Sequence, residues 1–251
     1  MLQYERFEKI MDLLKQQSSV RVTELVPLLD ASESTIRRDI AELDKAGRLR
    51  KVFGGAVSAG GTDNPVNAQS RDMGAKALTR TCEKMQVAVH AASLIEPGDL
   101  IYIDAGTTTG SMIDAITCYD AVYVTNGARH AIYLAQRGLK TYLLSGQVKA
   151  STEAIIGQDA VVSLQKYHFN KCFIGTDGID KDNGYTTADI EESMVKTEAM
   201  SRSEKAFVLA DSSKFGLVAS ITFAPLQAGT VITDQLPDSS YRTKTEIIEI
   251  K

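Results

Sequence analysis

A short stretch of glycine and threonine at residues 104–110 has the composition of an anion-binding turn. It reads Asp104-Ala-Gly-Thr-Thr-Thr-Gly110, follows an apolar run and precedes a helical pattern. Glycine lets a ligand approach the backbone, threonine hydroxyls donate hydrogen bonds, and a helix start offers free N–H groups at the positive end of its dipole. The stretch therefore predicts a phosphate cradle. On this motif alone, a turn that only caps the helix would be about as frequent.

Comparable polar turns follow four further runs that are predicted to be strands, and this recurrence favours ligand binding over simple capping. In a parallel sheet the carboxyl ends of the strands meet at one edge, which is where open α/β sheets bind their ligands. The turns are Thr125-Asn-Gly127, Ser145-Gly146 with Lys149 nearby, Gly175-Thr-Asp-Gly178 and Asp211-Ser-Ser-Lys-Phe-Gly216. The predicted ligand-binding residues are Asp104, Gly106, Thr107, Thr108, Thr109, Asn126, Gly127, Gly146, Lys149, Asp177 and Lys214.

A second group of residues with recognisable chemistry lies between residues 32 and 51 and is basic. On a helix that begins after Ser32, the apolar residues Ile36, Ile40 and Leu43 face one way. The opposite face and its flanks carry small, polar and basic residues, namely Ser34, Thr35, Arg37, Arg38, Ala41 and Lys45. An arginine on such a face can donate two hydrogen bonds to one guanine in the DNA major groove. The competing interpretation is a solvated face with charge pairs four residues apart, such as Arg38 with Glu42.

The elements around this face have the order of a winged helix-turn-helix. Apolar spacing predicts an N-terminal helix, and Thr23 can cap a second helix that has Pro27 in its first turn. Ser32 can cap a third helix, which Gly47 would end, and residues 49–57 form a hairpin that serves as the wing. This agreement favours DNA binding. The predicted DNA-binding residues are Thr23, Ser32, Ser34, Thr35, Arg37, Arg38, Lys45, Arg48, Arg50 and Lys51.

The charge of the chain is unevenly distributed. The 251 residues carry a net charge of −4, but residues 1–57 contain 10 Lys and Arg against 9 Asp and Glu and net +1. The remainder, with 18 Lys and Arg against 23 Asp and Glu, nets −5. A basic patch on a small segment is compatible with DNA binding, because global charge does not decide what a local face binds.

Several classes of protein are excluded by what the sequence lacks. Its cysteines, Cys82, Cys118 and Cys172, are too far apart for a CxxC zinc site or a disulfide framework. The histidines are scattered, so we expect no metal site, and we predict no cofactor. Because the sequence has neither a signal-peptide core nor a membrane-spanning run, we expect a cytoplasmic protein without a membrane partner.

The sequence pattern changes after the basic segment. Residues 58–70 are small and polar and predict a linker. Short apolar runs then alternate with helical stretches, which predicts an α/β domain with a mainly parallel sheet covered on both faces. The predicted strands are Leu100–Asp104, Ala121–Thr125, Lys140–Leu144, Lys171–Gly175, Ala206–Ala210, Thr230–Thr233 and Glu246–Ile250. The predicted helices are Glu83–Ile95, Ala128–Gln136, Ala154–Leu164 and Ile190–Ser201.

Two groups of charged residues have both a functional and a structural interpretation. The first group, next to the linker, comprises Arg71, Lys76, Arg80 and Lys84. These side chains could extend the DNA contact, but solvation of a helix is the favoured interpretation. In the second group, Glu192 and Lys196 could border the ligand pocket. For Asp189 and Glu191 we favour the structural interpretation, in which they form the acidic first turn of a helix next to a Glu–Lys pair four residues apart.

Specific motifs then identify a family. The stretch Ser32-Glu-Ser-Thr-Ile-Arg-Arg-Asp39, followed by Arg50-Lys-Val-Phe-Gly-Gly-Ala56, resembles the N-terminal signature of the DeoR family of bacterial transcriptional regulators. The resemblance continues to about residue 233. It implies an operator-binding winged helix-turn-helix at residues 3–57, a linker at residues 58–74, and a sensor and oligomerisation domain at residues 75–251. Because symmetric dimers double the operator contacts, we expect a homo-oligomer, either a dimer or a tetramer.

The resemblance also implies what the sensor domain binds. In the DeoR family this domain is similar to ribose-5-phosphate isomerase, and its effectors are phosphorylated sugars. The matching motifs are Asp104-Ala-Gly-Thr-Thr108, Val124-Thr-Asn-Gly127, Gly175-Thr-Asp-Gly-Ile179 and Leu209-Ala-Asp-Ser-Ser-Lys-Phe-Gly216. The strings Phe169–Ile179, Gly184–Thr187 and Glu192–Lys196 look most like repressors of fructose-utilisation operons, which implies fructose 1-phosphate as inducer. The phosphate would then bind Gly106 to Thr109 with Lys214 as a fixed charge, while Asn126, Asp177 and Lys149 would contact sugar hydroxyls.

Two other functions compete with a sugar-responsive repressor. One is an isomerase-like enzyme fused to a DNA-binding module, since Asp177 and Asp180 could move a proton beside a carbonyl. However, the Lys-Gly-Gly-Gly run of the isomerase is missing after Asp180, where this chain has Lys181-Asp-Asn-Gly-Tyr-Thr-Thr187. We therefore expect no enzymatic activity. The other is an activator, or a regulator that responds to a partner protein.

Overall fold

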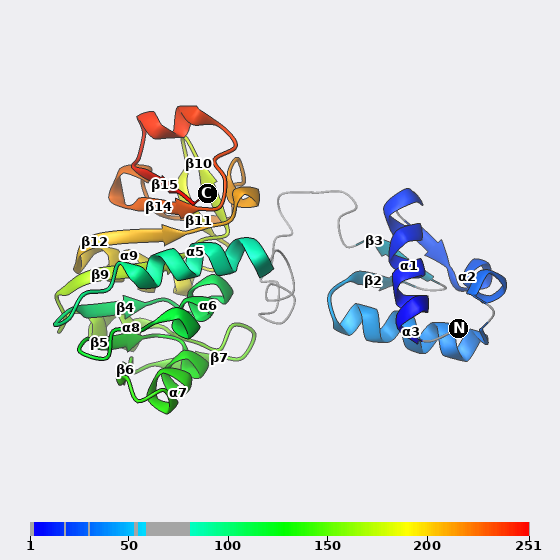
Figure 1. The fold of residues 1–251 in the computed structure, drawn as a ribbon, viewed down its shortest axis with the longest axis horizontal. Coiled ribbons are helices and arrows are strands. Elements are labelled where there is room, and N and C mark those ends of the chain that lie inside the picture. Colours follow the sequence, from blue (N-terminus) through cyan, green and yellow to red (C-terminus); the bar gives the residue numbers. More distant parts are fainter. Residues whose placement is uncertain (1–2, 18, 30, 53–54, 59–80, 251) are drawn as a thin grey trace. The chain divides into compact units, whose positions relative to one another are not determined.

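Two compact units, residues 1–67 and 68–251, make up the chain (Figure 1). The computed structural model describes residues 3–17, 19–29, 31–52, 55–58 and 81–250. Apart from Ser58, our predicted linker at residues 58–74 lies outside the described residues, so the domain boundaries at residues 57 and 75 stay a prediction.

The N-terminal unit consists of helices that pack on a small antiparallel sheet. The helices are α1 (Gln3–Gln17), α2 (Val22–Leu29) and α3 (Glu33–Lys45), and the strands are β1 (Ser19–Arg21), β2 (Leu49–Val52) and β3 (Gly55–Ser58), in the order β1-β3-β2. One apolar core holds the helices together through residues that include Ile10, Leu25, Ile36, Ile40 and Leu43. The predicted helix-turn-helix and its hairpin wing are confirmed.

Two details of this unit differ from our prediction. Strand β1, which pairs with β3 through Val20 and Ala56, was not predicted because its three residues are too few to show a period. Since β1 ends at Arg21, helix α2 begins at once with Val22, and Thr23 lies inside the helix instead of capping it. Pro27 likewise falls inside α2 and not in its first turn, so that prediction was wrong.

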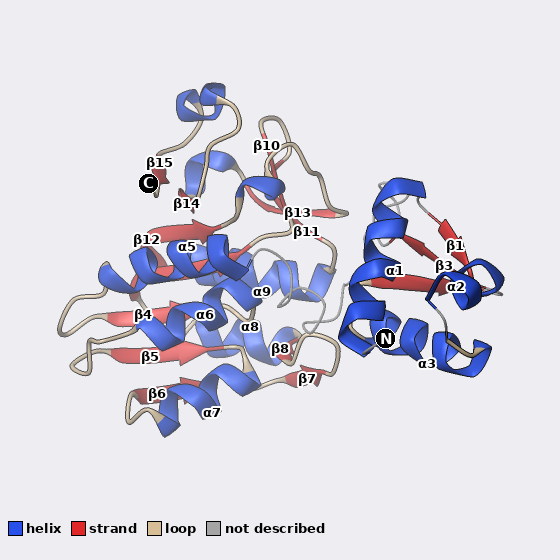
Figure 2. Cartoon of the chain, turned by 45° about the vertical axis from the view of Figure 1, so that its right-hand side comes forward, coloured by secondary structure: helices blue, strands red, loops and turns tan. Residues whose placement is uncertain are grey.

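The C-terminal unit is built on a seven-stranded parallel sheet with the strand order β15-β14-β12-β9-β4-β5-β6 (Figure 2). The strands are β4 (Leu100–Ile103), β5 (Val122–Thr125), β6 (Lys140–Leu143), β9 (Phe169–Gly175), β12 (Ser203–Leu209), β14 (Thr230–Thr233) and β15 (Ile247–Glu249). These are the seven strands predicted from the sequence. In the register of the central strands, Cys172 lies between Tyr102 and Ala206. Burial in this core raises the pKa of Cys172 to about 12, so the prediction that Cys172 is a core residue is confirmed.

Helices cover both faces of the sheet, which explains why its strands are apolar on both sides. The helices are α5 (Thr81–Ser93), α6 (Thr107–Ala115), α7 (Ala128–Gln136), α8 (Gln158–Leu164) and α9 (Ile190–Ser201). One apolar cluster joins α5, α6 and α7 to one face, and another joins α8 and α9 to the opposite face (Figure 2). Among the described residues, no helix combines the length and apolar character needed to span a membrane.

The predicted helix over Ala154–Leu164 was partly wrong. Residues Ala154–Ile156 form strand β8, which pairs with β7 (Gln147–Lys149) in an antiparallel hairpin, and the helix begins only at Gln158. Gly157 separates the two elements with φ +90°, a conformation that ends the strand and that favours glycine.

A small antiparallel sheet at the carboxyl side of the main sheet was also not predicted. It contains β10 (Gly178–Asp180), β11 (Gly184–Thr187) and β13 (Ile221–Ala224). Short 3-10 helices occupy Ser212–Lys214, Leu226–Ala228 and Ser239–Thr243. The turns that follow β4, β5 and β9 lie at the same edge of the main sheet as this small sheet and the β7–β8 hairpin (Figure 2).

Candidate functional site

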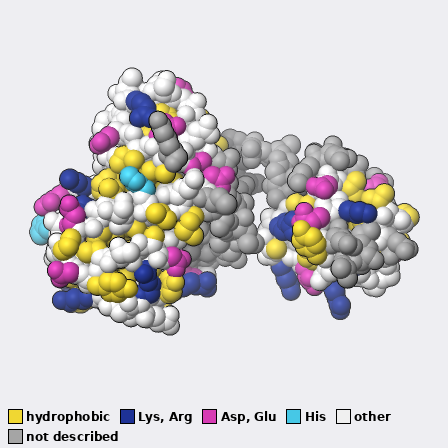
Figure 3. Space-filling model, in the orientation of Figure 1, with side chains coloured by type: hydrophobic (Ala, Val, Ile, Leu, Met, Phe, Trp, Pro, Cys, Tyr) yellow, Lys and Arg dark blue, Asp and Glu magenta, His cyan; other side chains and the backbone are white. Residues whose placement is uncertain are grey.

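Helix α3 presents a polar, basic face to solvent. Its residues Ile36, Ile40 and Leu43 are buried against the core, whereas Arg38 and Lys45 are exposed. Among the other predicted DNA-binding residues of this helix, Ser32, Ser34 and Arg37 are exposed and Thr35 is half-buried. Figure 3 shows Lys and Arg side chains that project from the N-terminal unit on the side on which Figure 1 shows α3.

The start of α3 is fixed by its own polar side chains. Ser32 caps the helix, because its hydroxyl accepts from the Thr35 backbone N–H at 3.2 Å. The Arg37 guanidinium pairs with Glu33 at 2.6 Å, and both side chains are exposed. The pair between Arg38 and Glu42 that we suggested as the alternative is not the charge pair observed on this part of the helix. Glu42 accepts from the side chain of Gln3 of α1 at 2.8 Å.

The predicted wing residues differ in their surroundings. Arg48 donates to Glu8 of α1 at 3.0 Å, so part of its role is to hold the wing to the first helix. Lys51 is exposed, and its backbone N–H donates to Asp44 at the end of α3 at 2.8 Å. Arg50 lies in β2 and Thr23 in α2, but their side chains are outside the described part of the structure.

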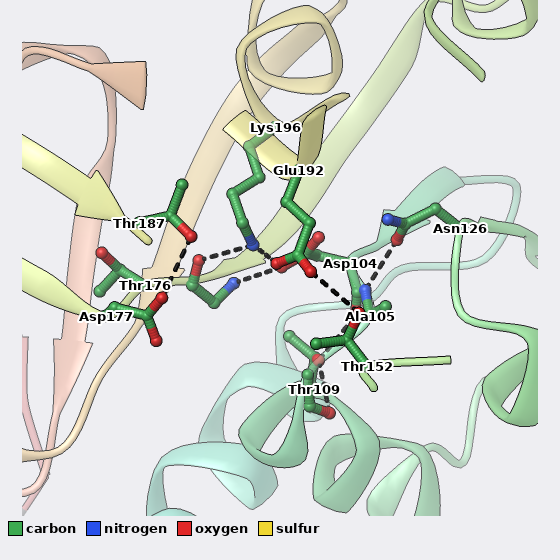
Figure 4. Close-up of polar contacts among 12 residues, drawn as sticks. Asp104, Ala105, Thr109, Asn126, Thr152, Thr176, Asp177, Thr187, Glu192 and Lys196 are labelled. Carbon is green, nitrogen blue, oxygen red and sulfur yellow. Dashed lines mark hydrogen bonds and ion pairs between the residues drawn. The ribbon is translucent and has the colours of Figure 1, made fainter. Parts of the chain in front are cut away.

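The carboxyl edge of the main sheet carries a buried ion pair between Asp104, at the end of β4, and Lys196 of α9 (Figure 4). Lys196 Nζ also donates to the Gly175 carbonyl at 3.1 Å, and the Gly175 N–H donates to Asp104 at 3.0 Å. Burial lowers the pKa of Lys196, but the carboxylates of Asp104, Glu192 and Asp177 together outweigh it and hold this pKa above its ordinary value. The pair therefore fixes the ends of β4 and β9 to one helix.

The turn after β4 is shaped by residues that we expected to bind ligand directly. Asn126 is almost fully buried, and its Oδ1 accepts from the Ala105 N–H at 2.7 Å. The Thr109 hydroxyl donates to the carbonyl oxygens of Asp104 and Gly106 at 2.6 and 3.1 Å. Since both side chains bond to backbone of the turn or next to it, their first role is to hold its shape.

Helix α6 begins within this turn. Gly106 is its N-cap and provides no side-chain hydrogen bond to the first N–H groups of the helix. Thr107 is half-buried, Thr108 is 9% exposed and Thr109 is fully buried. The first backbone N–H groups of the helix and three threonines therefore share this short segment.

Lys84 lies beside the same helix start, which corrects our expectation that it is a solvated residue. It is 6% exposed, and its Nζ donates to the Thr107 hydroxyl at 3.2 Å. The position is buried because Lys84 shares the face of α5 on which Val87, Ala88 and Ala91 are buried.

The β7–β8 hairpin is tied to the start of α9 by charged groups. Lys149 Nζ lies 2.7 Å from Asp189 and 3.0 Å from Glu192. The Thr152 hydroxyl donates to Glu192 at 2.9 Å (Figure 4). Burial lowers the pKa of Lys149, but these two carboxylates outweigh it and raise the pKa above its ordinary value. Two acidic partners thus already compensate the charge of Lys149.

The acidic residues at the start of α9 therefore cap the helix and also belong to the charged cluster around Lys149. Asp189 caps the helix by accepting from the Glu192 N–H at 2.9 Å, which agrees with the structural interpretation that we favoured. Lys196 pairs with Asp104, 92 residues earlier, and not with Glu192 one turn before it. Figure 4 shows Glu192 next to Lys196 and Asp104.

Asp177 and Asp180 accept hydrogen bonds from different partners. Asp177 accepts from the Thr187 hydroxyl at 3.1 Å and from the Ala188 N–H at 3.2 Å. Asp180, at the other end of β10, accepts from the Asn183 N–H at 2.9 Å in the turn to β11, and this bond lowers its pKa. Each of the two carboxylates is therefore held by its own contacts in the fold.

The remaining predicted ligand residues lie further from the start of α6 or have packing roles. Lys214 ends the 3-10 helix that follows β12, and β9 separates β12 from β4 in the sheet. Gly146 has φ +139°, and a Cβ there would lie 2.7 Å from the Ile156 carbonyl oxygen. Gly127 is the N-cap of α7, where a Cβ would lie 2.7 Å from Nδ1 of His130.

Comparison with known proteins identifies the family. Residues 6–61 match the DeoR-like helix-turn-helix domain, and residues 79–235 match the DeoR C-terminal sensor domain. The chain belongs to the DeoR family. This DeoR-family chain is 40% identical over 255 residues to the uncharacterized HTH-type transcriptional regulator FruR of Bacillus subtilis, and the match covers 100% of both chains.

Further comparisons give lower identities. The lactose phosphotransferase system repressor of Streptococcus mutans is 32% identical to this DeoR-family chain, with 98% of each covered. Among solved structures, ribose 5-phosphate isomerase A of Neisseria gonorrhoeae is similar with a TM-score of 0.40 and 17% identity, over 55% of this chain and 54% of that chain. The relatives compared by sequence are named as regulators, which agrees with the absence of an enzymatic role that we expected.

Sequence reasoning missed residues at both ends of this DeoR-family regulator. Lys84 was interpreted as a solvated residue of a helix, and Lys196 was considered as a border of the ligand pocket but without its partner Asp104. The sequence did contain a signal for Lys84, because its position follows the helical spacing of the buried apolar residues of the same helix. Asp39, which lies in the apolar stripe of α3, carried the same kind of signal and was also passed over.

Proposed function

We propose that this DeoR-family protein represses a sugar-utilisation operon and releases operator DNA when a phosphorylated sugar binds its sensor domain. The observation that carries the proposal is the α6 start, where Gly106 provides no side-chain cap to the helix and the buried Lys84 donates to the Thr107 hydroxyl. Fructose 1-phosphate is our best candidate, in line with the motifs that resemble fructose-operon repressors. The names of the FruR and lactose phosphotransferase system relatives support a sugar-related role.

The phosphate would bind at this helix start. Backbone N–H groups there have no carbonyl partner within the helix, and the helix dipole favours negative charge. A phosphate oxygen that accepts from the Thr107 N–H would come close to Lys84 Nζ, because Nζ is already 3.2 Å from the Thr107 hydroxyl. We therefore propose that Lys84 supplies the nearest positive charge and that Thr109 holds the turn in shape.

The two lysines that we first predicted for this role fit it less well. Lys149 is engaged by Asp189 and Glu192. Lys214 follows a strand two positions away from β4, or about 10 Å at the usual strand spacing. We propose that Lys214 reaches a more distant part of the ligand and that Lys149 orients the carboxylates around the sugar.

The sugar hydroxyls would face the polar cluster of Asp177, Glu192 and Asn126. Carboxylates accept hydrogen bonds from hydroxyls, and an amide can both accept and donate them. Partners in the fold fix the orientation of these groups. The sugar can weaken DNA binding only by binding the DNA-incompetent arrangement more tightly. We further propose that the repressor is a homo-oligomer, a dimer or tetramer, and works in the cytoplasm, where operator DNA lies.

Calorimetric titration of the full-length protein tests this proposal. We expect fructose 1-phosphate to bind and unphosphorylated fructose to bind at least about tenfold more weakly, because it leaves the donors of the turn unpaired. The variants Lys84→Met, and Thr108→Val combined with Lys214→Ala, should bind DNA normally but respond weakly to the effector. Equal affinity for fructose and fructose 1-phosphate would contradict the phosphate cradle, and another sugar phosphate with the same variant pattern would contradict only the fructose assignment.

A further inference from the structure

A charged pair lies beneath the recognition helix. Asp39 of α3 is fully buried, and Arg6 of α1 has a side chain that is only 13% exposed. Arg6 Nε lies 2.6 Å from one carboxylate oxygen of Asp39 and Arg6 Nη2 lies 3.1 Å from the other. Two parallel hydrogen bonds of this kind fix both the distance and the relative orientation of the two groups. The hydrogen bond to Asp39 raises the pKa of Arg6 above its ordinary value.

This pair lies on the side of α3 that packs against the core. Asp39 lies within the stripe formed by Ile36, Ile40 and Leu43, whose apolar contacts are not directional. Residues that face solvent, including Arg38, lie on the other side of the same helix. Side-chain ends lie about 5–6 Å from a helix axis, so a rotation of about 20° would displace a base-reading group by about 2 Å.

A buried ion pair is not an efficient source of stability. The cost of removing two charges from water can equal the attraction between them, and apolar residues of similar volume often stabilise a core as well or better. In some proteins such pairs instead select one arrangement among several. The Arg6–Asp39 pair has the geometry for that role, because it joins the first helix to the helix that reads DNA.

We propose that the Arg6–Asp39 pair is a positioning contact that determines operator specificity and contributes little net stability. The pair sets the rotation of α3 against α1, and this rotation decides which base edges Arg38 and its neighbours reach. The inference rests on the DNA-binding role of the helix-turn-helix domain and is independent of the effector, so it survives if no sugar phosphate binds.

The test asks whether loss of the pair changes the DNA specificity of the protein, its stability, or both. Wild-type full-length protein first selects its operator from a pool of random duplexes, and affinities are then measured for that operator and for a scrambled duplex of equal length. For the double variant Arg6→Met/Asp39→Leu, we expect the affinity for the scrambled duplex and the unfolding midpoint to stay close to wild type. The ratio of the two affinities should fall about tenfold or more, as for the loss of a base contact.

A matched control removes another contact between the same two helices. Gln3 of α1 bonds to Glu42 of α3 at 2.8 Å on the exposed side, so Gln3→Ala should leave the ratio unchanged. A folded double variant with a wild-type ratio would overturn the proposal, since stability alone would then account for the pair. If the double variant does not fold, Arg6→Lys keeps the charge but loses the planar fork. We expect a ratio several-fold below wild type for Arg6→Lys, and an unchanged ratio would again overturn the proposal.

Discussion

Lys196 of α9 forms a buried ion pair with Asp104 at the end of β4, across 92 residues of sequence. Lys196 comes from a helix on one face of the sheet, and Asp104 begins the turn that leads into α6 on the other face. The pair therefore joins the two layers at the edge where we propose that the effector binds.

Removal of one partner of this pair should destabilise the C-terminal unit. In Lys196→Met the Asp104 carboxylate stays buried without its cation, and we expect the free energy of unfolding to fall by about 3–5 kcal/mol. Denaturant unfolding followed by circular dichroism measures the change. Lys181→Met is the control, because it removes an exposed ion pair with Asp238 and should change the free energy of unfolding far less. Equal effects of the two substitutions would contradict the role of the buried pair.

The exposed face of α3 should read the operator. Arg38→Ala and Arg37→Ala both alter exposed side chains off the buried stripe, so both variants should remain folded. Loss of a base-reading arginine should weaken operator binding by about 1–3 kcal/mol. Because Arg37 is paired with Glu33 and Arg38 lies nearer the centre of the exposed face, we expect the larger effect for Arg38→Ala. Gel-shift titration of the folded variants measures it, and wild-type affinity in both would rule out α3 as the recognition helix.

Acid should destabilise the C-terminal unit in part through His130. This residue is buried between Gly110 and Gly127, and burial lowers its pKa from 6.5 to about 4. Because the unfolded chain binds the proton first, the contribution is complete above about pH 6.5 and is lost as the pH falls towards about 4. The loss should amount to roughly 3 kcal/mol.

Unfolding experiments between pH 7 and pH 4 check this contribution. Compared with wild type, His130→Asn should show a flatter dependence of the unfolding free energy on pH. Titration of the His130 ring signals by NMR gives the same pKa directly. An ordinary histidine pKa in the folded protein, or an identical acid dependence in the variant, would count against the burial argument.

The protein should not isomerise ribose 5-phosphate. Asp177 and Asp180 lie at opposite ends of β10 and each is held by hydrogen bonds of the fold, so they are not arranged to move one proton together. A coupled assay should give no rate above buffer. Turnover that disappears in Asp177→Asn would make the enzyme hypothesis the primary one.

Periodicity and strand-end residues predicted much of the fold. All seven strands of the parallel sheet were anticipated, and α7 and α9 begin and end where the sequence suggested. The β7–β8 hairpin was missed because Ala154–Ile156 is a short apolar run next to a helix, where a strand and a helical turn look alike in sequence. The small sheet of β10, β11 and β13 was missed because strands of 3 and 4 residues show too little alternation to be read.

The candidate effector site was only partly predictable, for a different reason. Turns after strands could be found from the sequence, and Asp104, Thr107 and Asn126 do lie at one edge of the sheet. Their partners Lys84 and Lys196 come from helices that only tertiary packing brings there. The pairing of Lys149 with two carboxylates from α9 was equally invisible, since the residues are 40 and 43 positions apart.

Operator binding in the presence and absence of effector tests the central claim most directly. Fluorescence anisotropy of a labelled operator, selected by the protein itself, would be measured with full-length protein and increasing fructose 1-phosphate. We predict that fructose 1-phosphate releases the operator, that fructose does not, and that Lys84→Met needs at least about tenfold more fructose 1-phosphate for the same release. Normal operator binding that no phosphorylated sugar alters would contradict the account, and a signal from a partner protein would then explain the sensor domain better.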